Sequence, residues 1–329
     1  MHVYLQTNDA GANEVIVFAA GDNGSLTETG RYATGGAGSG VPHLKSQGSV
    51  AAMGGSLLVT NAGSGDVSAF AIDGDALTLA GRTPSGGSEP TSIAVRGDLA
   101  FVLNAAGEPN VTGFRVGDGG LEPLAVTRPL PGTDPAQVGF TPDGSALLVT
   151  DRANDAIVEL PLDGEEGGEP TAHRSAGRTP YGFAFTRGGT LIVTEAAGAE
   201  RGAASVSSYA TGVRPVSRSV GNTRSEVCWA AVTPGGRFAY VTNFGDNTIS
   251  SYSIRDDGSI ELLEPIAAST RLGEPGLRDE ALSGDGRFLY ALDTDGRRLH
   301  AWHVREDGRL EEGGSTDGLP PTAAGLAAS

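Results

Sequence analysis

The strongest constraint on the fold is an apolar, strand-like run that recurs seven times and ends each time in one polar residue. Clear copies are Leu57–Asn61, Leu191–Glu195 and Phe288–Asp293. The polar ends are Asn8, Asn61, Asn104, Asp151, Glu195, Asn243 and Asp293, at successive spacings of 43 to 53 residues. Repeats of about 40 to 50 residues are typical of β-propeller blades. The spacing therefore predicts seven blades.

Each repeat has the pattern of four strands. The second repeat contains four apolar stretches, at 49–53, 57–60, 66–72 and 76–81. Between them lie turn sequences such as Gly54-Gly55 and Asp73-Gly74, which supply the positive φ angles of tight hairpins. The chain is therefore predicted to be all-β, with blades that are four-stranded antiparallel meanders.

The two ends of the chain are predicted to share one blade. The first repeat begins at its second strand, because Met1 already starts an apolar run, while the tail Thr322–Ala328 has no blade of its own. If the tail supplies the missing inner strand, the open edge is paired and the ring is closed. Residues 1–329 are then a single propeller domain.

Composition excludes several classes of partner. The net charge is −17 and Lys45 is the only lysine, so the long-range field repels nucleic acid. No apolar run reaches the roughly 18 residues of a membrane helix. Cys228 is the only cysteine and Met1–Leu5 reads as a strand without a signal core, which predicts a cytoplasmic protein. The oligomeric state is not indicated.

A ligand site is expected on one face of the ring. In an antiparallel meander the second strand ends where the first begins, so the polar strand ends and the blade-initial segments meet around a central funnel. Asn and Asp are ordinary turn formers that bond to nearby backbone. Glu195 is a poor turn former with a longer reach, and we predict it to be the functional carboxylate.

Other chemical motifs are not supported. His300 and His303 are three residues apart, which places them on opposite faces of a strand, so no shared metal is expected. The sequence lacks a nucleophile elbow, a phosphate-binding Gly-rich loop and paired cysteines, and we expect no cofactor. Cys228 beside Trp229 is interpreted as a packed residue.

Several blade motifs resemble the seven-bladed propeller lactonases, which include 6-phosphogluconolactonase and the carboxymuconate-lactonising enzyme. They are Asn61-Ala62-Gly63 with Val67–Phe70, then Phe140–Gly144, then Cys228-Trp229 with Tyr240–Asn243. The resemblance extends from Val3 to the C-terminus. It implies a seven-bladed fold and lactone chemistry on a small organic acid in the funnel.

The resemblance is broken at the family's site motifs. A His-Pro-His segment of the family corresponds here to Asp134-Pro135-Ala136, and a Gly-Pro-Arg-His segment corresponds to Thr179–Gly182. Glu195 matches the family's glutamate, so the resemblance implies that Glu195 is the acid/base. The cation and the proton-transfer group that lactone chemistry requires must then come from other residues.

Replacements for these groups are available near the predicted funnel. Arg152 and Arg178 are candidates to hold an anion, and His43, close to Lys45, is a candidate acid/base with Glu195. The blade-initial segments add one further candidate for catalysis and four for substrate binding: Asp134, and Gln137, Tyr181, Trp229 and Arg278.

Three functions remain open at this point. The first is a lactonase-like enzyme that takes a small-molecule substrate in the funnel. The second is a propeller that has lost this chemistry and serves as a small-molecule binder or a protein-interaction scaffold. The third is a different reaction that uses Asp134, Tyr181 and Glu195. The fold alone does not distinguish them.

Overall fold

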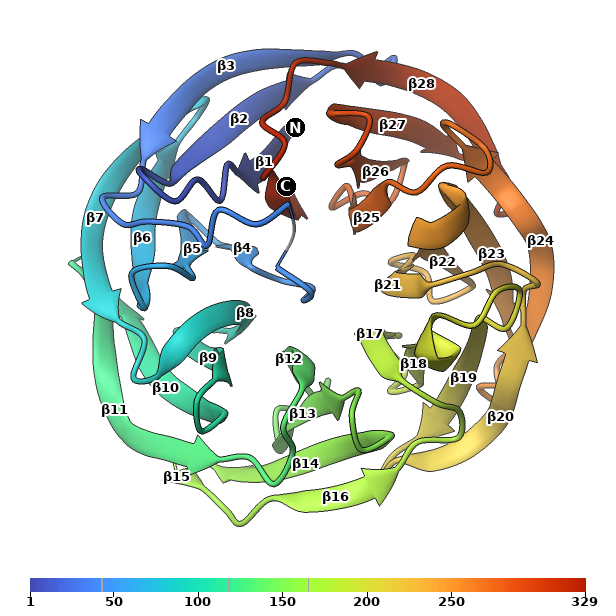
Figure 1. The fold of residues 1–329 in the computed structure, drawn as a ribbon, viewed down its shortest axis with the longest axis horizontal. Coiled ribbons are helices and arrows are strands. Elements are labelled where there is room, and N and C mark those ends of the chain that lie inside the picture. Colours follow the sequence, from blue (N-terminus) through green and yellow to red (C-terminus); the bar gives the residue numbers. More distant parts are fainter. Residues whose placement is uncertain (43, 118, 165) are drawn as a thin grey trace.

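A ring of seven antiparallel sheets is seen in the computed structural model (Figure 1). The structure describes residues 1–42, 44–117, 119–164 and 166–329, so the candidate His43 lies outside the described residues. In every sheet except the one that holds the N-terminal strands, the strands follow one another in chain order from the ring axis outward. The predicted all-β, seven-bladed propeller is therefore confirmed.

Blades two, three and four follow the N-terminal blade. The strands of blade two are β4 (Val50–Met53), β5 (Ser56–Asn61), β6 (Asp66–Asp73) and β7 (Ala76–Pro84). Those of blade three are β8 (Ser88–Arg96), β9 (Leu99–Ala106), β10 (Asn110–Gly117) and β11 (Gly120–Pro129). Blade four has β12 (Pro135–Phe140), β13 (Ala146–Asp151), β14 (Ala156–Asp163) and an outer strand in two pieces, β15 (Glu166–Gly167) and β16 (Thr171–Arg174).

Blades five to seven complete the ring. Blade five has β17 (Pro180–Phe185), β18 (Leu191–Glu195), the short 3₁₀ helix η1 (Ala197–Ala199), β19 (Ser205–Ala210) and β20 (Arg214–Gly221). Blade six has β21 (Val227–Val232), β22 (Phe238–Asn243), η2 (Phe244–Asp246), β23 (Thr248–Ile254) and β24 (Ile260–Ser269). Blade seven has β25 (Leu277–Leu282), β26 (Phe288–Asp293), β27 (Arg298–Val304) and β28 (Leu310–Thr316). In the described part of the chain, no helix is long and apolar enough to cross a membrane.

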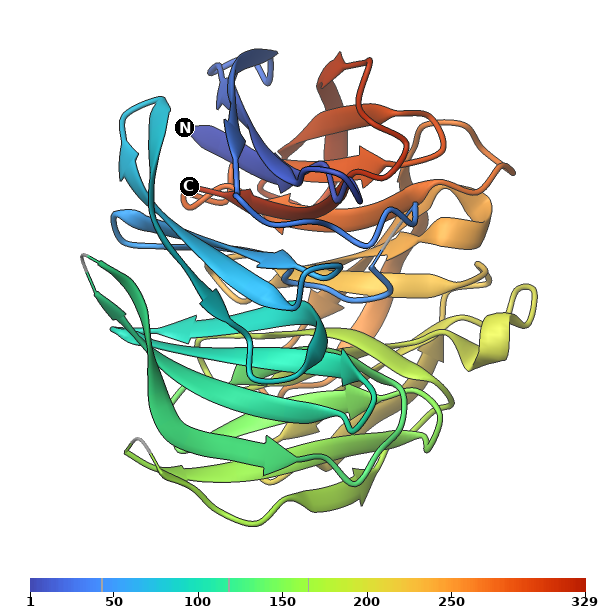
Figure 2. The ribbon, with the colours of Figure 1, turned by 60° about the vertical axis from the view of Figure 1, so that its left-hand side comes forward.

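The two ends of the chain close the ring, as predicted. Blade one consists of β29 (Ala324–Ala328), β1 (His2–Gln6), β2 (Glu14–Ala20) and β3 (Leu26–Ala33), in that order from the axis. β29 pairs with β1 through Val3↔Ala328, Tyr4↔Ala327 and Gln6↔Ala324. The two termini therefore lie side by side in one blade (Figure 2).

The core lies between blades, because each sheet packs face to face on its neighbours. One apolar cluster lies between each pair of adjacent blades, so the second strand of a blade is buried on both faces. In β13, for example, Leu147 packs with blade three and Leu148 packs with blade five. This two-sided burial explains why these strands read as continuous apolar runs instead of alternating patterns.

Candidate functional site

A cavity of about 420 Å³ opens on the predicted face, where the second strands end and the inner strands begin. We call it the funnel pocket. Blades four to seven supply most of its wall, and Lys45 reaches it from the segment before blade two. Its lining residues are Lys45, Asp134, Arg152, Ala153, Thr179, Tyr181, Ala196, Gly198, Ala199, Glu226, Cys228, Phe244 and Arg278.

Threonines next to the strand ends position the inner strands. Thr150 Oγ1 donates a hydrogen bond to the Tyr181 carbonyl at 2.5 Å, across the boundary from blade four to blade five. Thr194 Oγ1 makes the equivalent bond to the Cys228 carbonyl at 2.7 Å, from blade five to blade six. Tyr181 and Cys228 therefore reach the pocket from backbone that the preceding blade holds in place.

Arg152 is a cation in the pocket wall whose charge is partly compensated by an ion pair. Its guanidinium forms an ion pair with Asp134, donates to the Lys45 carbonyl at 3.2 Å, and lies 4.7 Å from the centre of the Tyr181 ring. Burial lowers the pKa of Arg152, but charge interactions with Tyr181 and Asp134 outweigh burial and the net shift is upward. Its buried Nε has no hydrogen-bond partner within the described chain.

Arg278 is the second cation, and it carries a less compensated charge. The residue is 6% exposed, its guanidinium lies 3.6 Å from the centre of the Phe244 ring, and Nε donates to Thr294 Oγ1 at 3.2 Å. In residues 1–42, 44–117, 119–164 and 166–329 no carboxylate forms a salt bridge with it. A buried charge is costly unless it is paired, so this guanidinium favours an anion in the pocket.

The phenol of Tyr181 and the thiol of Cys228 are the neutral titratable groups of the wall near pH 7. Burial raises the pKa of the Tyr181 hydroxyl above its usual range and raises that of the Cys228 thiol to about 12. A protonated thiol is a poor nucleophile, which agrees with our interpretation of Cys228 as a packed residue. Tyr181 can donate a hydrogen bond but not act as a base.

Glu195 does not line the pocket, contrary to the location we predicted for it. It is 0% exposed, and its two carboxylate oxygens accept hydrogen bonds from Ser205 Oγ at 2.6 Å and from Ser207 Oγ at 2.5 Å. Both serines belong to β19, the next strand of the same blade. The side chain therefore points into blade five, and its neighbour Ala196 reaches the pocket instead.

Gln137 and Trp229 lie behind the pocket wall and connect segments of backbone. Gln137 Nε2 donates to the Phe183 carbonyl at 3.0 Å, and Oε1 accepts from the Phe183 amide at 2.7 Å. Trp229 is 1% exposed, packs on Tyr181 with ring centres 5.6 Å apart, and donates from Nε1 to the Ser46 carbonyl at 3.2 Å. Neither residue is among those that line the pocket.

Residues 44–48, which we call the crossing segment, lie in the connection between β3 and β4, which extends toward the ring axis (Figure 1). Ser46 Oγ bonds to the Ala136 carbonyl of blade four, and Ser92 Oγ of blade three donates to the Gln47 carbonyl at 2.6 Å. Gln47 also bonds to both backbone groups of Ala230 in blade six. The segment thus joins blades on different sides of the ring, and of its residues Lys45 lines the pocket.

The site residues predicted from the sequence are therefore only partly brought together. Asp134, Arg152, Tyr181 and Arg278 meet in the pocket. Arg178 does not, because its side chain is 62% exposed and pairs with Glu200 at 2.7 Å. Thr179, Glu226 and Phe244 also line the pocket. The first two belong to blade-initial segments that we expected around the funnel, but none of the three was chosen as a site residue. Thr179 and Glu226 immediately precede inner strands and have φ angles of 57° and 54°, a strain that the amino-acid types do not reveal.

The described residues contain no group of three or more His, Cys, Asp or Glu side chains arranged to hold a metal ion. His300 stacks on Trp302, with ring centres 5.6 Å apart, whereas His303 lies against Phe288 at 4.4 Å. The two imidazoles therefore have separate neighbours. The polar groups of the funnel pocket are two guanidiniums, two carboxylates, an ammonium, a phenol, a hydroxyl and a thiol.

Comparison with known proteins agrees with the seven-bladed fold. Residues 216–323, about a third of the chain, match the family described as Lactonase, 7-bladed beta-propeller. The ring is similar to a putative 6-phosphogluconolactonase from Bacteroides fragilis (TM-score 0.77, 18% identity, 99% of this chain and 97% of that one covered). It is also similar to a periplasmic gluconolactonase from Pseudomonas aeruginosa (TM-score 0.73, 19% identity, 99% of each chain).

A third similar structure is a putative 6-phosphogluconolactonase from Bacteroides uniformis (TM-score 0.75, 16% identity, 94% of each chain). No protein of curated function matches the sequence significantly. At these identities, the structural similarity establishes a shared fold.

Proposed function

We propose that this chain, a seven-bladed propeller of the lactonase family, opens a small hydroxy-acid lactone in the funnel pocket. The observation that carries the proposal is Arg278, a guanidinium that faces the pocket, is 6% exposed and has no salt-bridge partner in the described chain. An organic acid or the developing oxyanion of a lactone would supply the missing negative charge. The family match favours a lactone substrate over an organic acid that is bound without conversion.

The pocket offers groups for each step of hydrolysis. Arg278 would bind the substrate carboxylate or the oxygen that becomes negative when water attacks the ring carbonyl. Asp134 would accept the proton of that water. The ring C–O bond then breaks, the proton passes to the leaving alkoxide, and the open hydroxy acid is released. The ion pair with Arg152 would hold Asp134 in position.

Glu195, our sequence-based acid/base, would need a rearrangement to take part. Both of its oxygens are occupied by serine hydroxyls inside the blade. Asp134 is half exposed and lines the pocket, so it is the better-placed carboxylate. The two assignments are distinguishable, because Asp134→Asn and Glu195→Gln each remove one carboxylate with little change of shape.

The proposal is tested with a panel of aldonolactones and muconolactone. We expect turnover above the buffer rate, and we expect Arg278→Met to raise KM by about tenfold or more, since a hydrogen bond to a charged group contributes about 1.5–3 kcal/mol. Arg255→Met is the matched control, because Arg255 is 64% exposed and pairs with Glu261 on blade six. Absence of turnover, or a KM that Arg278→Met leaves unchanged, would exclude the proposed chemistry.

A binding function without turnover is the second candidate, and the burial of Glu195 favours it. In that case the pocket holds a small organic anion that is not converted. Gluconate or a related acid should then raise the melting temperature of the protein, and Arg278→Met should abolish the shift while the lactones remain intact.

A further inference from the structure

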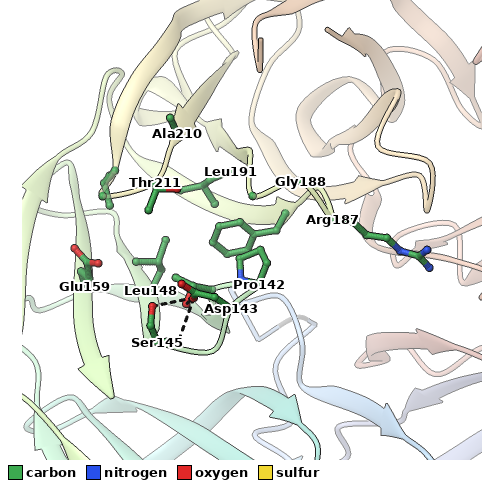
Figure 3. A pocket seen from close by; sticks show the side chains of 15 residues that line it. Pro142, Asp143, Ser145, Leu148, Glu159, Arg187, Gly188, Leu191, Ala210 and Thr211 are labelled. Atoms are coloured by element: carbon green, nitrogen blue, oxygen red, sulfur yellow. Dashed lines mark hydrogen bonds between the residues drawn. The ribbon is translucent and has the colours of Figure 1, made fainter. Parts of the chain in front are cut away.

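A second cavity, also of about 420 Å³, lies between blades four and five, away from the funnel pocket. Figure 3 shows this cavity, which we call the lateral cavity. Its lining comes from the β12–β13, β17–β18 and β19–β20 turns and the strands beside them. Arg152, Tyr181 and Arg278 of the funnel pocket are not among its lining residues.

The lateral cavity exists because the turns around it carry little side-chain bulk. Gly189 and Gly212 have φ angles of 93° and 70°, and a Cβ added to either would meet nothing within 4 Å. The apolar cluster between blades four and five is also the smallest of the seven in the described structure. The blade boundary is therefore left partly unfilled.

The floor of the lateral cavity is apolar. It is formed by Leu148, Phe185, Leu191 and Val213, of which Leu148, Leu191 and Val213 are less than 10% exposed. A volume of this size is within the range of small-molecule sites, about 300–1,000 Å³. An aromatic ring or a branched alkyl group of a small ligand would fit against this floor.

The polar rim is acidic. Thr141 Oγ1, the Ser145 backbone N–H and the Ser145 hydroxyl all donate to Asp143 Oδ1. These bonds, that from the Ser145 backbone first, lower the pKa of Asp143 to about 2. Asp143 therefore stays ionised. Glu159 Oε2 is 2.9 Å from His173 Nε2, while no partner of Oε1 occurs among the described residues.

In the described chain, the arginines near the rim form no ion pair with Asp143 or Glu159, and Arg214 donates to the Thr211 carbonyl at 3.4 Å. Arg187 belongs to the lining, but Figure 3 shows its guanidinium directed away from Glu159 and Asp143. Arg96 of blade three donates to the backbone carbonyls of Pro142 and Asp143 and not to the Asp143 carboxylate. His173 occupies one oxygen of Glu159. An apolar floor with an acidic rim is complementary to an organic cation.

We propose that the lateral cavity binds a small primary ammonium compound with an aromatic or branched apolar body, with the ammonium at Glu159 and the body on Phe185 and Leu148. This site is independent of the proposed lactone chemistry. It lies on different turns and has the opposite charge preference from the funnel pocket, which favours anions.

The test uses three probes of similar size that differ in charge: 2-phenylethylamine, 2-phenylethanol and 3-phenylpropionate. Ligand-observed NMR titrations of the full chain should show binding in the order amine, alcohol, carboxylate. Glu159→Gln should weaken amine binding by about two- to fivefold, the size of a partly exposed ion pair, and leave the alcohol unchanged. Glu261→Gln, a change at a 64% exposed acid on blade six, is the matched control.

A variant that blocks the lateral cavity tests the location of the binding site without changing any charge. Thr211 is an exposed rim residue, so Thr211→Trp should fill the mouth of the lateral cavity and abolish binding of all three probes without removing a core contact. Arg278→Met should leave amine binding unchanged. Equal binding of amine and carboxylate, or amine binding that survives Thr211→Trp, would overturn the assignment, as would no binding of the amine.

Discussion

The Ser207 hydroxyl donates a hydrogen bond to the Glu195 carboxylate at 2.5 Å, inside blade five. At the equivalent positions the donor is reversed: Asn61 Nδ2 donates to Ser68 Oγ at 2.8 Å in blade two, and Asn243 Nδ2 donates to Ser250 Oγ at 2.9 Å in blade six. In each blade the serine lies two residues beyond the partner that pairs with the strand end. Glu195 therefore occupies the position of the structural asparagines, with its longer side chain folded into the blade.

This equivalence predicts that Glu195→Gln is tolerated, because a glutamine amide can donate to Ser207 as Asn61 donates to Ser68. We expect a loss of less than about 1 kcal/mol in the free energy of unfolding, measured by urea titration. Glu195→Ala should cost about 2–3 kcal/mol, because it leaves buried serine hydroxyls unpaired and creates a cavity. If Glu195→Gln keeps the fold but abolishes turnover, the acid/base role predicted from the sequence would be supported instead.

Stability should fall as pH rises through neutrality because of Asp279 on β25. Burial raises its pKa to about 7, although a hydrogen bond from the Gly325 backbone and the charge of Arg278 act in the opposite direction. Burial also raises the pKa of the adjacent Glu280. Between about pH 4 and pH 7 the folded protein then holds a proton that the unfolded chain has released, so folding is less favourable at higher pH.

The free energy of unfolding should decrease by up to about 4 kcal/mol across this window from Asp279 alone and become level above pH 7. Urea midpoints at pH 5, 6, 7 and 8 measure the slope. Asp279→Asn, which cannot ionise, should make the slope shallower and raise stability at pH 8, while Glu280 keeps a slope of the same sign. A slope that Asp279→Asn leaves unchanged would assign the pH dependence to another group.

The crossing segment should depend on Gln47. Its amide donates to the Ala230 carbonyl at 2.9 Å and accepts from the Ala230 amide at 3.1 Å. Gln47→Ala leaves these backbone groups without a partner and should cost about 1–3 kcal/mol of stability. Hydrogen exchange at the Ala230 amide should accelerate.

Gln137→Ala is the matched control for that change, since Gln137 makes the same pair of bonds to Phe183 of the adjacent blade. It should lower stability by a similar amount and leave exchange at Ala230 unaffected. If the Ala230 amide exchanges at the same rate in Gln47→Ala and Gln137→Ala, the crossing segment is held in place without Gln47.

Closure of the ring should make unfolding a single event. Deleting residues 322–329 removes β29, including the buried Ala324 and Leu326, and opens the edge of β1. We expect the deletion to lower the free energy of unfolding by at least about 3 kcal/mol. In the deletion variant, the fluorescence of Trp229 in blade six and of Trp302 in blade seven should still change in one transition. Single-tryptophan variants separate the two signals, and deletion of Ser329 alone is the control. Two separate transitions would show that the blades unfold independently.

The predicted fold is confirmed in its details because it depends on local patterns. The apolar run Leu57–Thr60 and the turn Asp73-Gly74 specify strand and hairpin wherever they occur, and seven copies leave few alternatives. The pairing of the tail with β1 follows from the same count, because one blade lacked a strand. Arg278 and Tyr181 were among the candidates because the inner strands begin on the funnel face, and both line the pocket.

The direction of a side chain at a strand end follows different rules. Register shifts occur between Pro180 and Phe183 in blade five and between Val227 and Ala230 in blade six, and such irregularities re-aim the residues they contain. A pattern of residue types does not reveal them. The sequence also does not show that Gly177 leaves room for the Glu195 carboxylate, which lies 2.1 Å from where a Cβ would be.

The sequence by itself determined the seven blades, the closure of the ring and the face that carries the funnel pocket, because strand periodicity and turn chemistry act over a few residues. Only the tertiary structure decided which polar side chains enter the pocket. Glu195 turns into its blade because the hydroxyls of Ser205 and Ser207 donate to its two oxygens there, and Arg278 faces the pocket without a carboxylate partner in the described chain. That difference depends on partners distant in sequence, which are brought near only when the blades pack.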